Sequence, residues 1–212
     1  MIEYIKIDTP FERSTEGNKK LIRGQFRNDS VQYLAENVWE WTEKIDGTNI
    51  CVEWDGHRVS IFGRTERAEI PKHLMKPLEE MFLGEVNEEM FEQLFGDKHI
   101  ILYGEGYGNK IQKVGSLYRD DCSFILFDIY QPETDLWYSR NAVNGIADAL
   151  GIDSVKEVLY GTLNQAIAFV EGRPKSTIGI ADMEGLVGRP LVEMKDQQGK
   201  RIIVKVKVKD FV

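Results

Sequence analysis

The sequence lacks any apolar run near the roughly 20 residues that cross a bilayer. Its start, MIEYIKIDTP, shows no basic region followed by a continuous apolar segment, so we expect neither export nor membrane insertion. Cysteine is scarce: Cys51 and Cys122 are the two in the chain, without the CxxC spacing of a zinc site. Both lie in apolar, strand-like segments, so we expect reduced thiols in the core of a cytoplasmic protein.

Net positive charge is also lacking. The formal net charge of -8 argues against a protein that coats nucleic acid indiscriminately. The charge is uneven, however, because KDQQGKRIIVKVKVKDFV from Lys195 onward is basic, whereas EEMFLGEVNEEMFEQLFGD is strongly acidic. A polyanionic ligand is therefore expected near the C-terminal strand.

Repeats, low-complexity tracts and an obvious linker are absent from the 212 residues, so we expect one compact domain over 1–212, working as a monomer. The first forty residues are predicted as loops around short extended pieces. VWEWTEKI has strand composition, and TNICVEWDGHRVSIFGR alternates about Asp55-Gly56 as a hairpin does.

The rest of the chain alternates between helical and strand patterns. Apolar spacing predicts two short helices within 71–95, and SRNAVNGIADALG and TLNQAIAFVEG are predicted as capped helices. HIILYGEGYG, CSFILFDIYQ, GLVGRP and RIIVKVKVKDF are predicted strands, and LWY is expected to pair with the second of them. Hairpin-like groups of strands with helices between them indicate an α+β fold with mixed or antiparallel sheets, not a Rossmann domain.

Four features could carry chemistry. Lys44, in WTEKIDGTN, is predicted at a strand end before a glycine turn, where it is either a surface charge or a nucleophile in a cleft. Glu105, in LYGEGYG, has a glycine on each side that would let a ligand approach the backbone; a flexible strand exit is the alternative. This stretch lacks the GxxxxGK[ST] order of a phosphate loop.

The other two features lie near the C-terminus. Glu184, in DMEGLVGR, is a carboxylate at a strand entry, either solvated or binding a cation. Lys205, Lys207 and Lys209 are predicted to project from one strand face, which is either a solvated edge or a phosphate site. Together the features supply a lysine nucleophile, carboxylates for Mg²⁺ and hydroxyls, and cations for phosphates.

Read in order, these stretches resemble motifs I, III, IIIa, IV and V of the covalent nucleotidyltransferase superfamily of DNA ligases, RNA ligases and capping enzymes. The matching stretches are KIDG, LYGEGYG, FILFDIY, EGLVG and VKVKVK. Asn49 in KIDGTN and Arg64 in FGRT make the RNA ligase 2 type the better resemblance, and FERSTEGNKKLIRGQF is similar to phage members. The resemblance implies a nucleotidyltransferase domain that seals 3'-OH and 5'-phosphate RNA ends, in a host cytoplasm if phage-encoded.

The resemblance also implies a role for each matching residue. Lys44 resembles the nucleophile that attacks ATP and forms lysyl-AMP, and Lys205 and Lys207 are expected to bind phosphates and to favour its neutral amine. Carboxylates at Glu184 and Glu105 are the implied ligands of Mg²⁺ or Mn²⁺, and Glu105 also of the ribose. The implied residues for adenine are Glu43 and Phe127, and those for the nucleotide and the RNA 5'-phosphate are Asn49 and Arg64.

Alternatives stay open at this point. Phe127 could be simple strand core. The same chemistry could serve a DNA ligase or a capping-type guanylyltransferase, or the chain could be a non-catalytic RNA- or nucleotide-binding relative. Many relatives carry a further C-terminal domain, so the sequence is expected to be either a minimal ligase or part of a longer protein.

Overall fold

The computed structural model describes residues 2–16, 20–65 and 67–212 and groups them into two compact units. Unit 1 comprises Met1–Ile5 and Asp46–Val155, and unit 2 comprises Lys6–Ile45 and Lys156–Val212. Residues 17–19, part of the stretch predicted as loop, lie outside the described residues.

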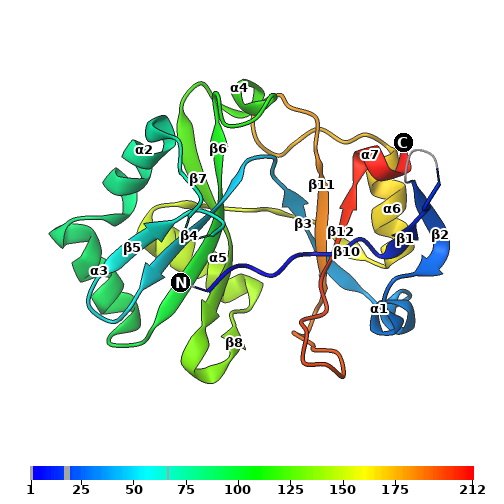
Figure 1. The fold of residues 1–212 in the computed structure, drawn as a ribbon, viewed down its shortest axis with the longest axis horizontal. Coiled ribbons are helices and arrows are strands. Elements are labelled where there is room, and N and C mark those ends of the chain that lie inside the picture. Colours follow the sequence, from blue (N-terminus) through cyan, green and yellow to red (C-terminus); the bar gives the residue numbers. More distant parts are fainter. Residues whose placement is uncertain (1, 17–19, 66) are drawn as a thin grey trace. The chain divides into compact units, whose positions relative to one another are not determined.

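The described part of unit 1 is built on a six-stranded sheet in the order β5-β4-β6-β7-β8, with β9 paired to β7 in parallel (Figure 1). Its strands are β4 (Thr48–Trp54), β5 (Val59–Phe62), β6 (Ile100–Gly108), β7 (Cys122–Gln131), β8 (Leu136–Trp137) and β9 (Asp153–Ser154). Its helices are α2 (Lys72–Phe82), α3 (Glu85–Phe95), α4 (Gly115–Tyr118), α5 (Arg140–Leu150) and the 3-10 helix η1 (Pro132–Thr134).

The predicted hairpin is confirmed, because β4 and β5 pair antiparallel and Gly56 takes a positive φ of 96° between them. The pairing of LWY is confirmed as well, with Trp137 opposite Tyr130. Alternation along β4, β6 and β7 sends one set of side chains into a core with α2, α3 and α5. The opposite face carries an aromatic group that includes Tyr103 and Phe127.

Unit 2 contains a four-stranded antiparallel sheet in the order β10-β3-β11-β12 and a separate β1-β2 pair. Its strands are β1 (Phe11–Arg13), β2 (Leu21–Phe26), β3 (Trp39–Lys44), β10 (Glu157–Gly161), β11 (Gly185–Pro190) and β12 (Val204–Lys207). Its helices are α1 (Asp29–Leu34), α6 (Leu163–Glu171) and α7 (Val208–Phe211). The sheet, α1 and α6 enclose a core around the stacked rings of Trp39 and Trp41.

Two expectations in unit 2 are wrong. The loop-rich start contains helix α1, which is N-capped by Asn28 through its side-chain contacts with the backbone of Ser30 and Val31. The last strand ends at Lys207, so Lys209 lies on α7 and not on the face of Lys205 and Lys207.

The strand gives way to a helix for identifiable reasons. The backbone N–H of Val208 donates to the carbonyl of Glu184, and the next residues form a helical turn. This turn packs Phe211 against the core of unit 2 and brings Asp210 to Arg13, which donates to both carboxylate oxygens at 2.9 Å.

Cys51 and Cys122 are buried free thiols on β4 and β7, as predicted. Burial raises the pKa of the Cys51 thiol to about 12, so it stays protonated at neutral pH. Throughout the described ranges, no helix combines the length and the apolar character that crossing a membrane requires.

Candidate functional site

Lys44 is the last residue of β3, as the sequence predicts, in a central strand of the unit 2 sheet. β3 pairs with β11 in a register that sets Lys44 opposite Gly185, the residue after Glu184. This register brings the Nζ of Lys44 to 2.7 Å from the Oε2 of Glu184. The Lys44 side chain is 24% exposed, so it is neither a free surface charge nor sealed from solvent.

Glu184 joins two lysines from different strands. Its second oxygen, Oε1, accepts a hydrogen bond from the Nζ of Lys207 at 2.5 Å, because β12 lies on the other side of β11. Burial by itself would raise the pKa of the Glu184 carboxyl, but Lys44 and Lys207 together hold it below its usual value. The result is a partly buried lysine–carboxylate–lysine array built from three adjacent strand ends.

Lys205 shares a face of β12 with Lys207, while Val204 and Val206 point into the core, as alternation predicts. Burial, then the positive charges of Lys207 and Lys44, lowers the pKa of the Lys205 ammonium. The cluster of positive charge expected from the sequence is therefore present. In this structure it adds to burial in lowering the pKa of Lys205.

Glu43, the neighbour of Lys44, has a fully buried carboxylate that fastens a distant loop. Oε1 accepts from the Ser176 hydroxyl at 2.5 Å, and Oε2 accepts from the backbone N–H and the hydroxyl of Thr177 at 2.8 and 2.5 Å. The loop then leads through Met183 to Glu184. Sequence reasoning missed Ser176 and Thr177, although KST following a helix is a polar turn signal.

We expect Glu43→Gln to lower the free energy of unfolding by about 1–3 kcal/mol, because an amide presents donors where the loop needs acceptors. The urea midpoint measures this loss. Asp182→Asn is the matched control in the same loop, since its ion pair with Lys175 is exposed and contributes at most about 1 kcal/mol. Equal midpoints for the two variants would contradict this account of Glu43.

Asn49 and Glu105 belong to unit 1, where they lie directly opposite each other on β4 and β6. Both are half-buried, and alternation places them on the sheet face that also carries Cys51 and Tyr103. The structure thus brings a carboxamide and a carboxylate together at one position of this face.

The glycines around Glu105 have a different purpose from the one predicted. A Cβ on Gly104 would meet the Phe124 ring at 2.1 Å, and one on Gly106 would meet the Leu74 side chain at 2.5 Å. They make room for core side chains and not for a ligand. Gly47 of KIDG is likewise required, because its Cβ would come within 2.3 Å of the Gly106 carbonyl oxygen.

Phe127 lies on the face of the unit 1 sheet that carries Tyr103, half-buried in the aromatic group. Its ring meets the edge of Tyr4, with centroids 5.0 Å apart, so core packing accounts for part of its surface. Its stacking on adenine stays a prediction. Arg64 follows β5 in unit 1 and is exposed.

A metal would have few protein ligands. Among the described residues, no three His, Cys, Asp or Glu side chains gather as a ligand set. Mg²⁺ is nevertheless commonly held by one or two carboxylates together with substrate phosphates and water. The hard oxygen donors of Glu184 in unit 2 and of Glu105 in unit 1, each taken by itself, suit that mode.

A lysine amine held beside a carboxylate and a second lysine can act as a nucleophile once it has lost its proton. The family model for RNA ligase matches residues 37–207. The chain therefore belongs to the RNA ligase family. No curated protein sequence matches it.

Solved RNA ligases share the fold. A mutant of Naegleria gruberi RNA ligase with ATP and Mn superposes with a TM-score of 0.65 at 19% identity, over 97% of this chain and 61% of that one. The same ligase with PPi gives a TM-score of 0.63 at 20% identity, over 95% and 59%. The chain thus spans about three fifths of the length of these ligases.

Proposed function

We propose that this chain is an ATP-dependent RNA ligase, which joins 3'-OH and 5'-phosphate RNA ends by way of lysyl-AMP. The observation that carries the proposal is the Lys44–Glu184–Lys207 array within a chain of the RNA ligase family. A binding protein has little use for a lysine held beside a carboxylate and a second cation. The ATP, Mn and PPi in the solved ligases support the choice of nucleotide and metal.

In the first step the Nζ of Lys44, after losing its proton, attacks the α-phosphorus of ATP. A P–N bond forms, the bond from that phosphorus to the pyrophosphate oxygen breaks, and pyrophosphate leaves. Lys205 and Lys207 bind the phosphates, whose negative charge would offset the positive charges that Lys44, Lys205 and Lys207 bring together. Glu184 orients the Nζ of Lys44.

The two later steps use the same nucleotide. An oxygen of the RNA 5'-phosphate attacks the α-phosphorus, and the P–N bond breaks, which returns Lys44 as an amine. The RNA 3'-OH then loses its proton and attacks the activated 5'-phosphate, forming the phosphodiester as AMP leaves. Positioning and charge stabilisation are the main contributions of the protein to such displacements.

The remaining roles are part of the same proposal. A divalent metal, Mg²⁺ or Mn²⁺, would supply charge neutralisation of the phosphates; Glu184 would hold it in unit 2, and Glu105 is the candidate carboxylate for it in unit 1. Glu105 also binds the ribose. Phe127 in unit 1 and Glu43 in unit 2 are the residues proposed for the adenine; a contact of the Glu43 carboxylate with the base would compete with its hydrogen bonds to Ser176 and Thr177. Asn49 and Arg64 bind the nucleotide and the RNA 5'-phosphate.

Mass spectrometry of the protein after incubation with ATP and Mg²⁺ tests the proposal. We expect a gain of one AMP that maps to Lys44 and is lost in acid. Parallel incubation with GTP identifies the nucleotide that the protein uses. Sealing assays on nicked duplexes with RNA or DNA on the 3'-OH side identify the strand that it seals. Labelling by GTP alone would overturn the ATP-dependent ligase in favour of a guanylyltransferase.

A further inference from the structure

Basic side chains predominate at one end of the unit 1 sheet, and acidic side chains at the other. At one end, called here the basic end, Thr48 pairs with Gly106; at the other, the acidic end, Trp54 pairs with Ile100. The two pairs lie six residue steps apart along β6, from Ile100 to Gly106, so a rise of about 3.3 Å per residue separates the ends by roughly 20 Å.

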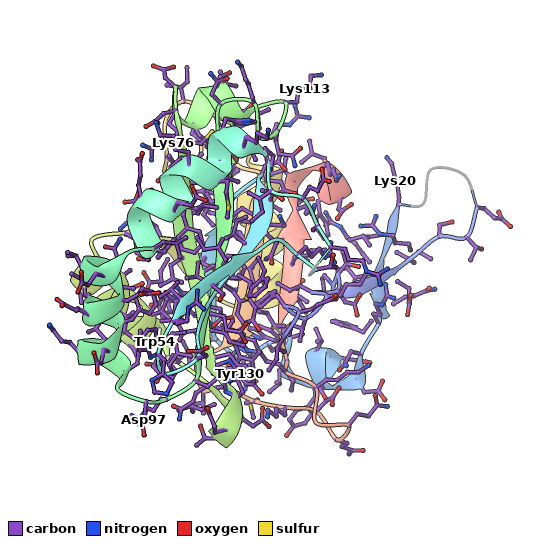
Figure 2. The ribbon with its side chains drawn as sticks, turned by 60° about the vertical axis from the view of Figure 1, so that its left-hand side comes forward. Lys20, Trp54, Lys76, Asp97, Lys113 and Tyr130 are labelled. Carbon is purple, nitrogen blue, oxygen red and sulfur yellow. The ribbon has the colours of Figure 1, made fainter. Side chains whose placement is uncertain are left out.

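The basic end gathers the residues after β5, the start of α2 and the β6–β7 connection. Leu74, in the first turn of α2, lies against Gly106 and so fixes that turn at this end. Figure 2 shows the labelled Lys76 and Lys113 at the same end of unit 1. The basic residues of these segments are Arg64, Arg67, Lys72, Lys76, Lys110, Lys113 and Arg119, against the acidic Glu69, Asp120 and Asp121.

The acidic end gathers α3 and the turns beside it. The Trp54 ring lies 5.9 Å from the Phe91 ring of α3, and its Nε1 donates to the Gly96 carbonyl at 2.9 Å. Figure 2 shows the labelled Asp97 at the end opposite Lys113. The acidic residues here are Asp55, Glu85, Glu88, Glu89, Glu92, Asp97 and Glu133.

Within the β6–β7 connection, two lysines are available for a ligand. Arg119 is engaged by Asp121, which holds its guanidinium through two hydrogen bonds. Lys110 and Lys113 are exposed, and in the described ranges of the chain no carboxylate pairs with either. Lys76, by comparison, faces Glu80 at 3.9 Å on the surface of α2.

The same connection is fastened to the turn that follows Lys44 in the sequence. The Gln112 amide, between the two lysines, donates to the Gly47 carbonyl at 2.8 Å. The backbone N–H of Asp46 donates to the Tyr118 hydroxyl at 3.3 Å. A ligand bound by Lys110 and Lys113 would therefore sit on a loop anchored to the KIDG turn.

We propose that Lys110 and Lys113, at the basic end of unit 1, bind the phosphate backbone of the RNA strand that is sealed. Exposed, unpaired ammonium groups are suited to a polyanion, while the acidic end repels it and so favours one orientation. The inference rests on the proposed RNA ligase function. It adds a second cationic surface to the C-terminal lysines that the sequence singles out.

The test compares Lys110→Glu/Lys113→Glu with the matched control Arg58→Glu/Lys98→Glu, which makes the same charge change with exposed residues of the acidic end. Fluorescence anisotropy with a labelled nicked RNA duplex, over a series of salt concentrations, gives affinity and salt slope. We expect the basic-end variant to bind about tenfold more weakly, with the log–log salt slope reduced by about 2. The control should bind as wild type does.

Equal weakening of RNA binding in both variants would overturn the inference, because net charge alone would then explain the effect. Wild-type affinity in the basic-end variant would overturn it as well. Lys113→Glu alone, with half the slope change, gives a second measure of the same surface. Labelling with ATP needs no RNA and is measured in parallel. If the wild-type protein takes up AMP and the basic-end variant still binds RNA normally, only this inference is wrong. If the wild-type protein takes up no AMP, the proposed function is wrong.

Discussion

Lys44→Ala is expected to abolish covalent attachment of AMP, with a loss of roughly 10³-fold or more in the rate of self-adenylylation. In the proposed reaction the bond to AMP is made by the Nζ of Lys44, which lies 2.7 Å from Glu184, and alanine offers no amine to replace it. The rate is measured by transfer of labelled AMP from ATP to protein, followed by denaturation.

Two controls separate chemistry from folding. Lys44→Arg keeps a cation beside Glu184 but offers a guanidinium, which stays protonated and is no nucleophile, so it should be equally inactive with an unchanged melting temperature. Lys209→Ala removes an exposed lysine of α7 and should label as wild type does. An acid-labile AMP adduct on Lys44→Ala would show that another lysine is the nucleophile.

Local pattern predicts the elements of this fold well where side-chain periodicity is strong. The Asp55-Gly56 hairpin, the helices within 71–95, and the caps Ser139 and Thr162 all follow from residue type and spacing. The strand end at Lys44 follows too. These features depend on neighbours in the sequence, which a single sequence displays directly.

Features that depend on distant partners could not be predicted in this way. The strand after Arg201 continues to alternate as far as Lys209, yet α7 begins at Val208 because Asp210 and Phe211 have partners elsewhere in unit 2. Nothing in the sequence around Glu43 indicates that its carboxylate accepts hydrogen bonds from Thr177. Grouping into two units likewise depends on contacts between remote segments.

The candidate site is an intermediate case. Motif order places Lys44, Glu184 and Lys207 in one reaction, but it does not give the adjacency of β3, β11 and β12. That adjacency makes a single carboxylate the partner of both lysines. The sequence suggests a metal or cation ligand at Glu184, and the structure adds its hydrogen bond to the Nζ of Lys44, the proposed nucleophile.

Glu184→Ala is therefore expected to slow self-adenylylation by about 10²–10³-fold. Without the carboxylate, the partly buried ammonium groups of Lys44 and Lys207 lose their shared counter-charge, and the Nζ of Lys44 loses its orientation. The proposed metal would lose a ligand as well. The decrease is measured as the rate of AMP transfer at saturating ATP.

Asp210→Ala is the matched control, because it removes a carboxylate of unit 2 that accepts two hydrogen bonds from Arg13 outside the lysine array. It should adenylylate as wild type does even if it melts earlier. Glu184→Asp tests the metal role: its shorter side chain should lower the rate, and added Mn²⁺ should restore part of it, which a purely structural defect would not allow. Near-normal adenylylation by Glu184→Ala would contradict this role. Glu184 would then form only a structural ion pair, and another group would have to orient the Nζ of Lys44.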